Sequence, residues 1–363
     1  MKNGRLYEID LFRFIAAVMV VIYHYAFRGF ASDHMTVMPY HFMSSFAKYG
    51  YLGVDLFFII SGFVILMTAS KGSARHFFIS RCVRLYPAFW TCCTITFLVT
   101  ILIGAPRYAS TFRQYSVNMT MLSGFLDVKP KLAAWVHAPF IDGVYWTLFV
   151  EMKFYFLIFL ILCLKMIGKA DVLLGAWLAV SLALSKWDVP RISFFLIPDY
   201  APLFISGAFF YIIFISGLNF FRGFILSVSY ATSVVEVIFV TGRKAVHYGI
   251  SFNPLVITIV LTVFFLLFAL ISAKMSGWLS TPRWLLLGAI TYPLYLLHQN
   301  IGYMLFNMEY PYENANIVML TTVLLVLFIS YSVNRFIEQR YAYKLKPALM
   351  RLFRLLPSPV PSQ

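Results

Sequence analysis

The sequence predicts an all-α membrane protein: a polytopic bundle of about ten transmembrane helices with both termini in the cytoplasm. Hydrophobic residues make up 61% of the 363 residues and charged residues only 12%, a composition that soluble domains of this length do not have. Apolar runs about as long as a bilayer-spanning helix recur along the whole chain. Unpaired backbone groups cannot face lipid, so these runs are expected to be helices.

Ten apolar runs have about the length that a membrane crossing requires. The fifth and sixth are the most interrupted, because Lys186, Pro190 and Pro198 fall in that region. Residues 1–340 are therefore expected to form one transmembrane domain, and residues 341–363 a cytoplasmic tail. The ten runs are residues 11–29, 51–70, 82–103, 144–164, 170–187, 195–215, 220–240, 254–273, 284–306 and 316–335.

The orientation follows from the positive charges between the runs. With the N-terminus inside, 18 Lys and Arg residues fall on the inner side and 10 on the outer side. The positive-inside rule therefore places both termini in the cytoplasm. The net charge of +15 comes from Lys and Arg residues in the loops between apolar runs. These charges therefore indicate orientation in the membrane and argue against a nucleic-acid partner. The longest loop, residues 104–143, is then outside, and loops of this length are often functional.

Metal binding is not indicated by the sequence. The four cysteines lie in or beside apolar segments, with neither the spacing of metal ligands nor a disulfide framework. We expect them to act as small hydrophobic side chains. They are Cys82, Cys92, Cys93 and Cys163.

Four ionisable side chains interrupt four different spans at one predicted depth. His24, Asp55, Glu151 and His298 each lie a few residues outside the midpoint of a span. At ~1.5 Å per residue, all four lie ~4–8 Å to the outer side of the bilayer centre. Such groups are costly in a membrane unless they pair or face a wet cavity. Two histidines and two carboxylates in one layer indicate a proton-handling site, with a purely structural polar network as the alternative.

Three arginines are predicted at the inner edge of the membrane. Arg13 precedes His24 by eleven residues, so the two side chains point the same way about 16 Å apart along one helix. Arg81 and Arg84 begin the third span and share a helix face. Three guanidinium groups together are typical of a phosphate-binding patch. Membrane anchoring and contact with lipid headgroups explain the pair comparably well.

The two layers suit a donor with a phosphate-bearing head and a long, thin arm, which is the shape of acyl-CoA. Its head would lie on the three arginines, and its reactive end would reach His24. The acceptor would enter from the outer side. His24 would act as general base, and Asp55 or Glu151 would orient its imidazole. The hypothesis is acyl transfer across the membrane; whether the acyl group is carried covalently on His24 stays open.

The same stretches resemble the motifs of the acyltransferase-3 family of integral membrane acyltransferases, over most of the chain. The resemblance implies a ten-helix core in a stand-alone protein. It also implies transfer of acetyl, or another short acyl group, from cytoplasmic acyl-CoA to a sugar or similar acceptor of the cell envelope. The expected location is then a bacterial inner membrane. The matching residues are Arg13 with His24, Gly53 to Phe63, Arg81 and Arg84 followed by Pro87, Trp146, Leu148 and Glu151, and Tyr292 to His298.

The fourth span departs from the family pattern. Members often carry a second acid and a Gln after the Glu, where this chain has Met152 and Lys153. A cation thus lies two residues from Glu151. It either alters the choice of acceptor or lies off the cavity face.

Two other classes of function use the same features. A transporter of an envelope intermediate or of protons could use the His and carboxylate layer as a relay. A scaffold within an envelope assembly would leave the buried charges unexplained. The arginine pair favours the enzyme, because a transporter needs no fixed phosphate site beneath its relay. The expected partners are therefore acyl-CoA, an envelope carbohydrate and membrane lipid.

Overall fold

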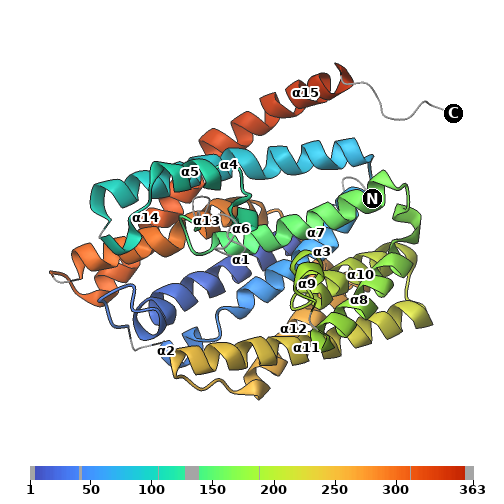
Figure 1. The fold of residues 1–363 in the computed structure, drawn as a ribbon, viewed down its shortest axis with the longest axis horizontal. Coiled ribbons are helices and arrows are strands. Elements are labelled where there is room, and N and C mark those ends of the chain that lie inside the picture. The colour runs from blue at the N-terminus through green and yellow to red at the C-terminus, as the bar shows by residue number, and fades with distance from the viewer. Residues whose placement is uncertain are drawn as a thin grey trace.

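The computed structural model describes residues 5–40, 43–104, 106–126, 139–187, 189–310 and 312–355, and these residues form helices and no strand. Figure 1 shows the long helices running roughly side by side in one bundle. The helices are α1 (Tyr7–Tyr23), α2 (Ser44–Ala47), α3 (Leu52–Ala69), α4 (Ala74–Ile103), α5 (Phe112–Asn118), α6 (Ser123–Leu126), α7 (Tyr145–Cys163), α8 (Ala170–Lys186), α9 (Pro190–Leu196), α10 (Ala201–Ser216), α11 (Phe220–Tyr248), α12 (Pro254–Ser272), α13 (Trp284–Glu309), α14 (Ala315–Val333) and α15 (Gln339–Leu355). Two π-helical segments, η1 (His24–Ser32) and η5 (Asn334–Glu338), extend α1 and α14.

Nine helical segments among the described residues are long and apolar enough to cross a membrane. They match nine of the ten predicted runs. The tenth run, residues 284–306, is α13, a 26-residue helix with polar residues in its second half. Its polar residues are buried because α13 packs between α1, α4 and α14. The predicted all-α polytopic bundle is confirmed, while its orientation in the membrane stays a prediction.

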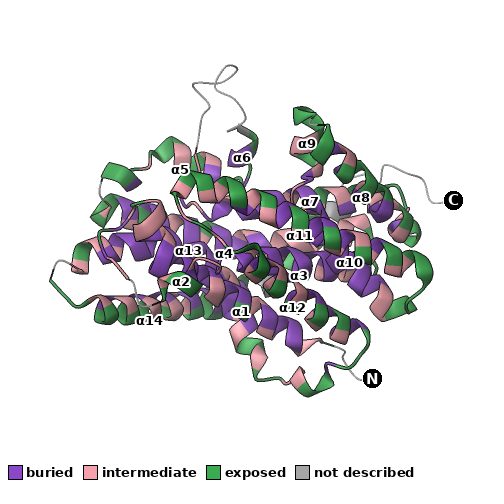
Figure 2. Cartoon of the chain, turned by 90° about the horizontal axis from the view of Figure 1, so that it is seen from below, coloured by how far each residue is buried: buried purple, intermediate pink, exposed green. Residues whose placement is uncertain are grey.

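The centre of the bundle is formed by α1, α3, α10 and α13, where Figure 2 shows buried residues along most of each helix. Two glycines bring α3 and α10 into backbone contact. A Cβ atom at Gly62 would lie 2.0 Å from the carbonyl oxygen of Phe204, and one at Gly207 would lie 1.9 Å from that of Ile59. Small residues of this kind let membrane helices approach closely. This contact sets how α3 presents Asp55 and Ser61 to the cavities described below.

Replacing Gly207 by Ala is expected to destabilise the protein, because the new methyl group can only be accommodated if α10 moves away from α3. Overpacking of this kind costs about 1–3 kcal/mol. A fall in the unfolding temperature of the purified protein measures it. Gly168→Ala is the matched control, since a Cβ there meets nothing within 4 Å. Equal unfolding temperatures for the two variants would contradict close contact of α3 with α10.

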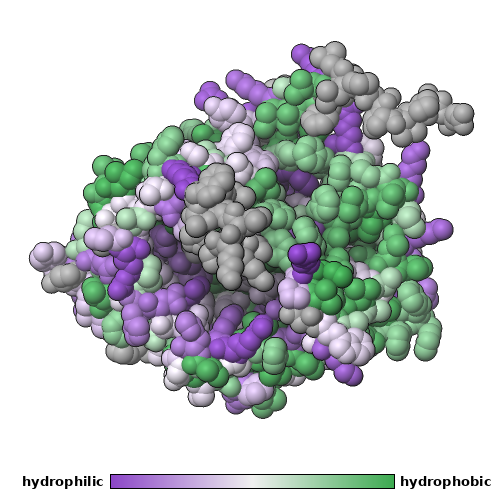
Figure 3. Space-filling view, viewed as in Figure 1, coloured by the Kyte–Doolittle hydropathy of each residue, from purple (hydrophilic) through white to green (hydrophobic). Residues whose placement is uncertain are grey.

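The surface of the bundle is apolar where lipid is expected. Figure 3 shows hydrophobic side chains over the region of α8 and hydrophilic ones near α2. Exposed Leu266, Leu324 and Phe328 add to this apolar surface on α12 and α14. A soluble protein would bury such side chains, so the distribution agrees with a bundle surrounded by lipid.

Two predicted regions are only partly described. In the loop at residues 104–143, α5 and α6 are short helices, and residues 127–138 lie outside the described part of the chain. The predicted tail, residues 341–363, is helical as far as Leu355. There α15 runs beside α4, and Arg75 donates a hydrogen bond to the carbonyl oxygen of Met350 at 2.9 Å.

Candidate active site

Two cavities lie one after the other inside the bundle. The inner cavity, named for the predicted orientation, is lined by the three predicted arginines and Glu151. The outer cavity, of about 160 Å³, is lined by His24, Arg28, Asp55 and Lys244 among others. Val54 and Tyr295 line both, so the two cavities meet at these side chains. The Tyr295 ring lies 5.5 Å from that of Phe57, and its hydroxyl is 2.7 Å from that of Thr147.

His24 begins the π-helical segment η1, immediately after α1. Segments of this type occur often at functional sites. His24 is 4% exposed, and both ring nitrogens have partners. Nδ1 lies 2.8 Å from the carbonyl oxygen of Val20 and 3.2 Å from Nε2 of His298. Nε2 lies 3.3 Å from Nη1 of Arg28.

These contacts assign the hydrogens on the two rings. A guanidinium group only donates, so Nε2 of His24 accepts from Arg28 and Nδ1 carries the hydrogen. Nδ1 of His298 lies 2.9 Å from the carbonyl oxygen of Tyr295, so it donates there and leaves its Nε2 as an acceptor. The Nδ1 hydrogen of His24 is therefore shared between the carbonyl oxygen of Val20 and Nε2 of His298. In this arrangement the lone pair of His24 Nε2 accepts from Arg28, and both side chains line the outer cavity.

The two predicted carboxylates lie in different cavities. Asp55 lines the outer cavity with His24. Glu151 lines the inner cavity, where it accepts hydrogen bonds from the Ser61 and Tyr155 hydroxyls, each at 2.6 Å. The predicted layer is therefore divided between two cavities, and its common depth stays a prediction. Within the described chain neither carboxylate hydrogen-bonds His24, whose ring nitrogens contact Val20, Arg28 and His298 instead.

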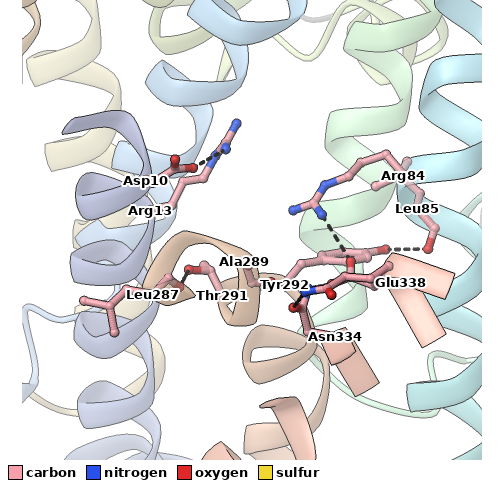
Figure 4. A network of polar contacts seen from close by, with 11 residues as sticks. Asp10, Arg13, Arg84, Leu85, Leu287, Ala289, Thr291, Tyr292, Asn334 and Glu338 are labelled. Atoms are coloured by element: carbon pink, nitrogen blue, oxygen red, sulfur yellow. Dashed lines mark hydrogen bonds and ion pairs between the residues drawn. The ribbon is translucent and has the colours of Figure 1, made fainter. Parts of the chain in front are cut away.

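Arg13, Arg81 and Arg84 come together as predicted, around the inner cavity. Figure 4 shows the guanidinium groups of Arg13 and Arg84 pointing into the same space beside Tyr292. The Arg84 guanidinium lies 5.8 Å from the centroid of the Tyr292 ring. Arg81 comes from the same face of α4, and its Nε is buried with no hydrogen-bond partner among the described residues.

Acidic residues hold two of these arginines in place. Asp10 contacts Arg13 at 3.3 Å, and Glu338 contacts Arg84 at 3.2 Å. A proline supports the second pair: Pro293 has no N–H to donate, so the carbonyl oxygen of Ala289 is free to accept from Asn334 Nδ2 at 3.2 Å. The same amide donates to Glu338 at 2.5 Å (Figure 4).

The charges of the inner cavity favour an anionic ligand. Three guanidinium groups line it, and the carboxylate of Glu151 is the one acid among its described lining residues. Arginines that are oriented in advance and only partly neutralised are suited to phosphate, which accepts several charge-assisted hydrogen bonds.

The sequence profile of the acyltransferase-3 family, described as an acyltransferase domain, matches residues 6–335. The chain belongs to this family. It is 30% identical over 151 residues to an O-acetyl transferase of Shigella phage Sf6. This alignment covers 40% of this chain and 43% of the relative. It is 25% identical over 170 residues to the peptidoglycan O-acetyltransferase OatA of Listeria monocytogenes serovar 1/2a (strain ATCC BAA-679 / EGD-e). This second alignment covers 42% of this chain and 26% of the relative. The alignments thus span less than half of each relative, and no solved structure matches.

In this acyltransferase-3 protein the structure adds residues that the sequence interpretation did not place at the site. Arg28, one of the ten positive charges predicted on the outer side, follows His24 by four residues and shares its helix face. Asp142 had no sequence signal. It accepts hydrogen bonds from the backbone N–H groups of Val144 and Asn300, both at 3.1 Å, and so ties the outer loop to α13 beside His298. Burial raises the pKa of the Asp142 carboxyl to about 7, although these bonds oppose the shift.

Metal ligation has no structural support in the described part of this acyltransferase-3 chain. No group of three or more His, Cys, Asp or Glu residues there is arranged to hold an ion. The four cysteines are all free.

Proposed function

We propose that this protein is a membrane O-acyltransferase that moves an acetyl, or another short acyl group, from cytoplasmic acyl-CoA to a hydroxyl of a cell-envelope glycan. The observation that carries the proposal is the meeting of an arginine-lined cavity with a histidine-lined cavity at Val54 and Tyr295. The names of both relatives support the choice of acetyl, and the name of the Listeria relative supports a glycan hydroxyl.

The donor would bind with its phosphates on Arg13, Arg81 and Arg84. Its arm would pass Val54 and Tyr295, and its thioester would lie at His24. Eleven helical residues separate Arg13 from His24, or ~16 Å, which an extended pantetheine arm can span. A donor without such an arm, held on the same arginines, would not reach the histidine.

His24 would act as the general base. Its Nε2 takes the proton from the acceptor hydroxyl, whose oxygen attacks the thioester carbonyl carbon. The tetrahedral intermediate then expels the CoA thiolate, which takes the proton back from His24 Nε2, and the ester remains on the acceptor. His298 accepts the Nδ1 hydrogen of His24 and stabilises the imidazolium. Arg28, which lies on Nε2 in this structure, would move to the developing oxyanion and donate to it.

The outer cavity has the chemistry of a sugar site. Trp146 and Tyr200, whose rings lie 5.6 Å apart, supply flat apolar faces. Asp55, Lys244 and the Tyr248 hydroxyl supply polar groups around them. A few polar groups within an aromatic wall are the usual lining of a site for a small, partly polar ligand.

The sidedness of the two substrates tests the proposal. In sealed vesicles of known orientation, acyl-CoA should be used only from the cytoplasmic face and the glycan acceptor only from the outer face. Product is measured by the mass increase of one acetyl group. Transfer with both substrates on the cytoplasmic side of leak-free vesicles would refute the cross-membrane arrangement. Movement of acceptor across the membrane without acyl transfer would instead favour the transporter.

A further inference from the structure

Lys153, where the sequence departs from the family pattern, lines a cavity of its own. It follows Glu151 by two residues on α7 but is absent from the lining of the inner cavity. It lines instead a cavity of about 780 Å³ between α7, α8, α9 and α11, which we call the side chamber. The neighbouring helices α7, α8 and α9 lie at the edge of the bundle in Figure 2. The charged lining residues are Lys153, Lys186, Asp199, Glu236 and Arg243.

The Lys153 ammonium has no acidic partner in the described chain. The residue is 8% exposed. Its Nζ lies 3.7 Å from the centroid of the Phe194 ring and 4.3 Å from that of Phe149. Aromatic faces attract a cation but do not replace the hydrogen bonds it makes in water. A buried ammonium at this depth in a membrane protein is usually paired, so its position points to an anionic ligand in the side chamber.

The opposite side of the side chamber offers an acceptor. Glu236 on α11 is 9% exposed and makes neither a hydrogen bond nor an ion pair with a described residue. Asp199, by contrast, is paired with Arg243 at 3.1 Å. A ligand that satisfies both free groups must accept hydrogen bonds from Lys153 and donate them to Glu236. A phosphate joined to a hydroxyl-rich group has this combination.

The side chamber opens in two directions. Leu182, Val235 and Phe239 line it and are 40%, 64% and 60% exposed, so one opening lies on an apolar surface that would face lipid. Asp199 and Tyr200 line both the side chamber and the outer cavity, so the other opening leads toward His24. A ligand could therefore leave an apolar chain in the lipid while its polar end enters the catalytic cavity.

We propose that the side chamber binds the phosphate of a lipid-borne acceptor, a glycan carried on a phosphorylated long-chain alcohol. The apolar chain leaves past Leu182 and Phe239, the phosphate contacts Lys153, and the sugar passes Tyr200 to reach His24. This inference rests on the proposed acyl transfer for the role of the sugar, and it adds the class of acceptor. Lys153 is then a binding residue for the acceptor.

Binding of a polyprenyl phosphate to the purified protein tests the assignment. The protein is placed in nanodiscs of phosphatidylcholine, and affinity for the polyprenyl phosphate is compared with that for the same polyprenol without phosphate. The phosphate should bind at least tenfold more tightly to the wild type. Lys153→Met should remove that preference and Lys153→Arg should keep it. Lys169→Met, an exposed lysine near the inner end of α8, is the matched control and should also keep it.

Acetyl-CoA affinity, which should be unchanged in Lys153→Met, shows that the variant is folded. Equal preference for the phosphate in the wild type and in folded Lys153→Met would overturn the proposal. The proposal would also be overturned if phosphatidylglycerol competed with the polyprenyl phosphate at equal affinity and with the same dependence on Lys153. The side chamber would then be a site for the headgroups of bilayer lipids. The assay needs no turnover. If acyl transfer is not observed but binding of the phosphate still depends on Lys153, the proposed enzymatic function is wrong while the proposed phosphate site stands.

Discussion

Replacing His24 by Ala is expected to lower acyl transfer by about 10²–10⁴-fold, the usual contribution of a general base. His24 is the one histidine among the described residues that line the outer cavity, and His298 contacts it from behind through Nδ1. Initial rates with saturating acyl-CoA measure the loss. Donor affinity should change little, since His24 does not line the inner cavity.

The control for this variant is His34→Asn. His34 is exposed and has a φ of 52°, which Asn tolerates better than most residues. It should transfer at the wild-type rate. Substantial activity in the His24→Ala protein would show that His24 is not the general base.

Substitution of His298 tests whether this residue only orients His24 or takes part in the chemistry itself. It acts on the acceptor only through Nδ1 of His24, so His298→Ala should lower kcat more than it raises KM. In the double variant with His24→Ala, the second substitution should cost nothing further, because the group it positions is already gone. Additive losses would show that His298 has an independent role.

Removing the charge of Arg84 or Arg81 is expected to weaken acyl-CoA binding by about 1.5–3 kcal/mol, the value of a charge-assisted hydrogen bond. Substituting Arg84 also leaves Glu338 without its arginine. The informative variant is therefore Arg84→Ala with Glu338→Gln, which removes the pair without leaving an uncompensated carboxylate. Calorimetric titration with CoA gives the change in Kd. Arg283→Ala, an exposed arginine at the start of α13, should bind normally.

A fragment of the donor makes the test specific for phosphate. Acetyl-pantetheine has the arm and thioester but no phosphate, so its affinity should be the same in wild type and variant. A loss of affinity for the fragment equal to the loss for CoA would mean that the arginines shape the cavity without binding the phosphates.

Much of this architecture follows from the sequence alone. The positions of the helices follow from apolar length, since a segment in lipid must satisfy its own backbone hydrogen bonds and can do so only as a helix. The convergence of Arg13, Arg81 and Arg84 was also predictable, because all three were placed at one edge of the membrane and two share a helix face.

The partners of the ionisable groups were decided by the tertiary structure. Residue counting along a helix predicts depth but not the direction in which that helix faces its neighbours. Glu151 and His24 have similar predicted depths, yet they line different cavities, because Val54 and Tyr295 lie where the cavities meet. The pairing of His24 with His298, and the isolation of Lys153 from Glu151, depend in the same way on how α1, α7 and α13 pack. That packing is set by contacts between residues far apart in the chain, such as the close approach of α3 and α10 at Gly207, which no local pattern encodes.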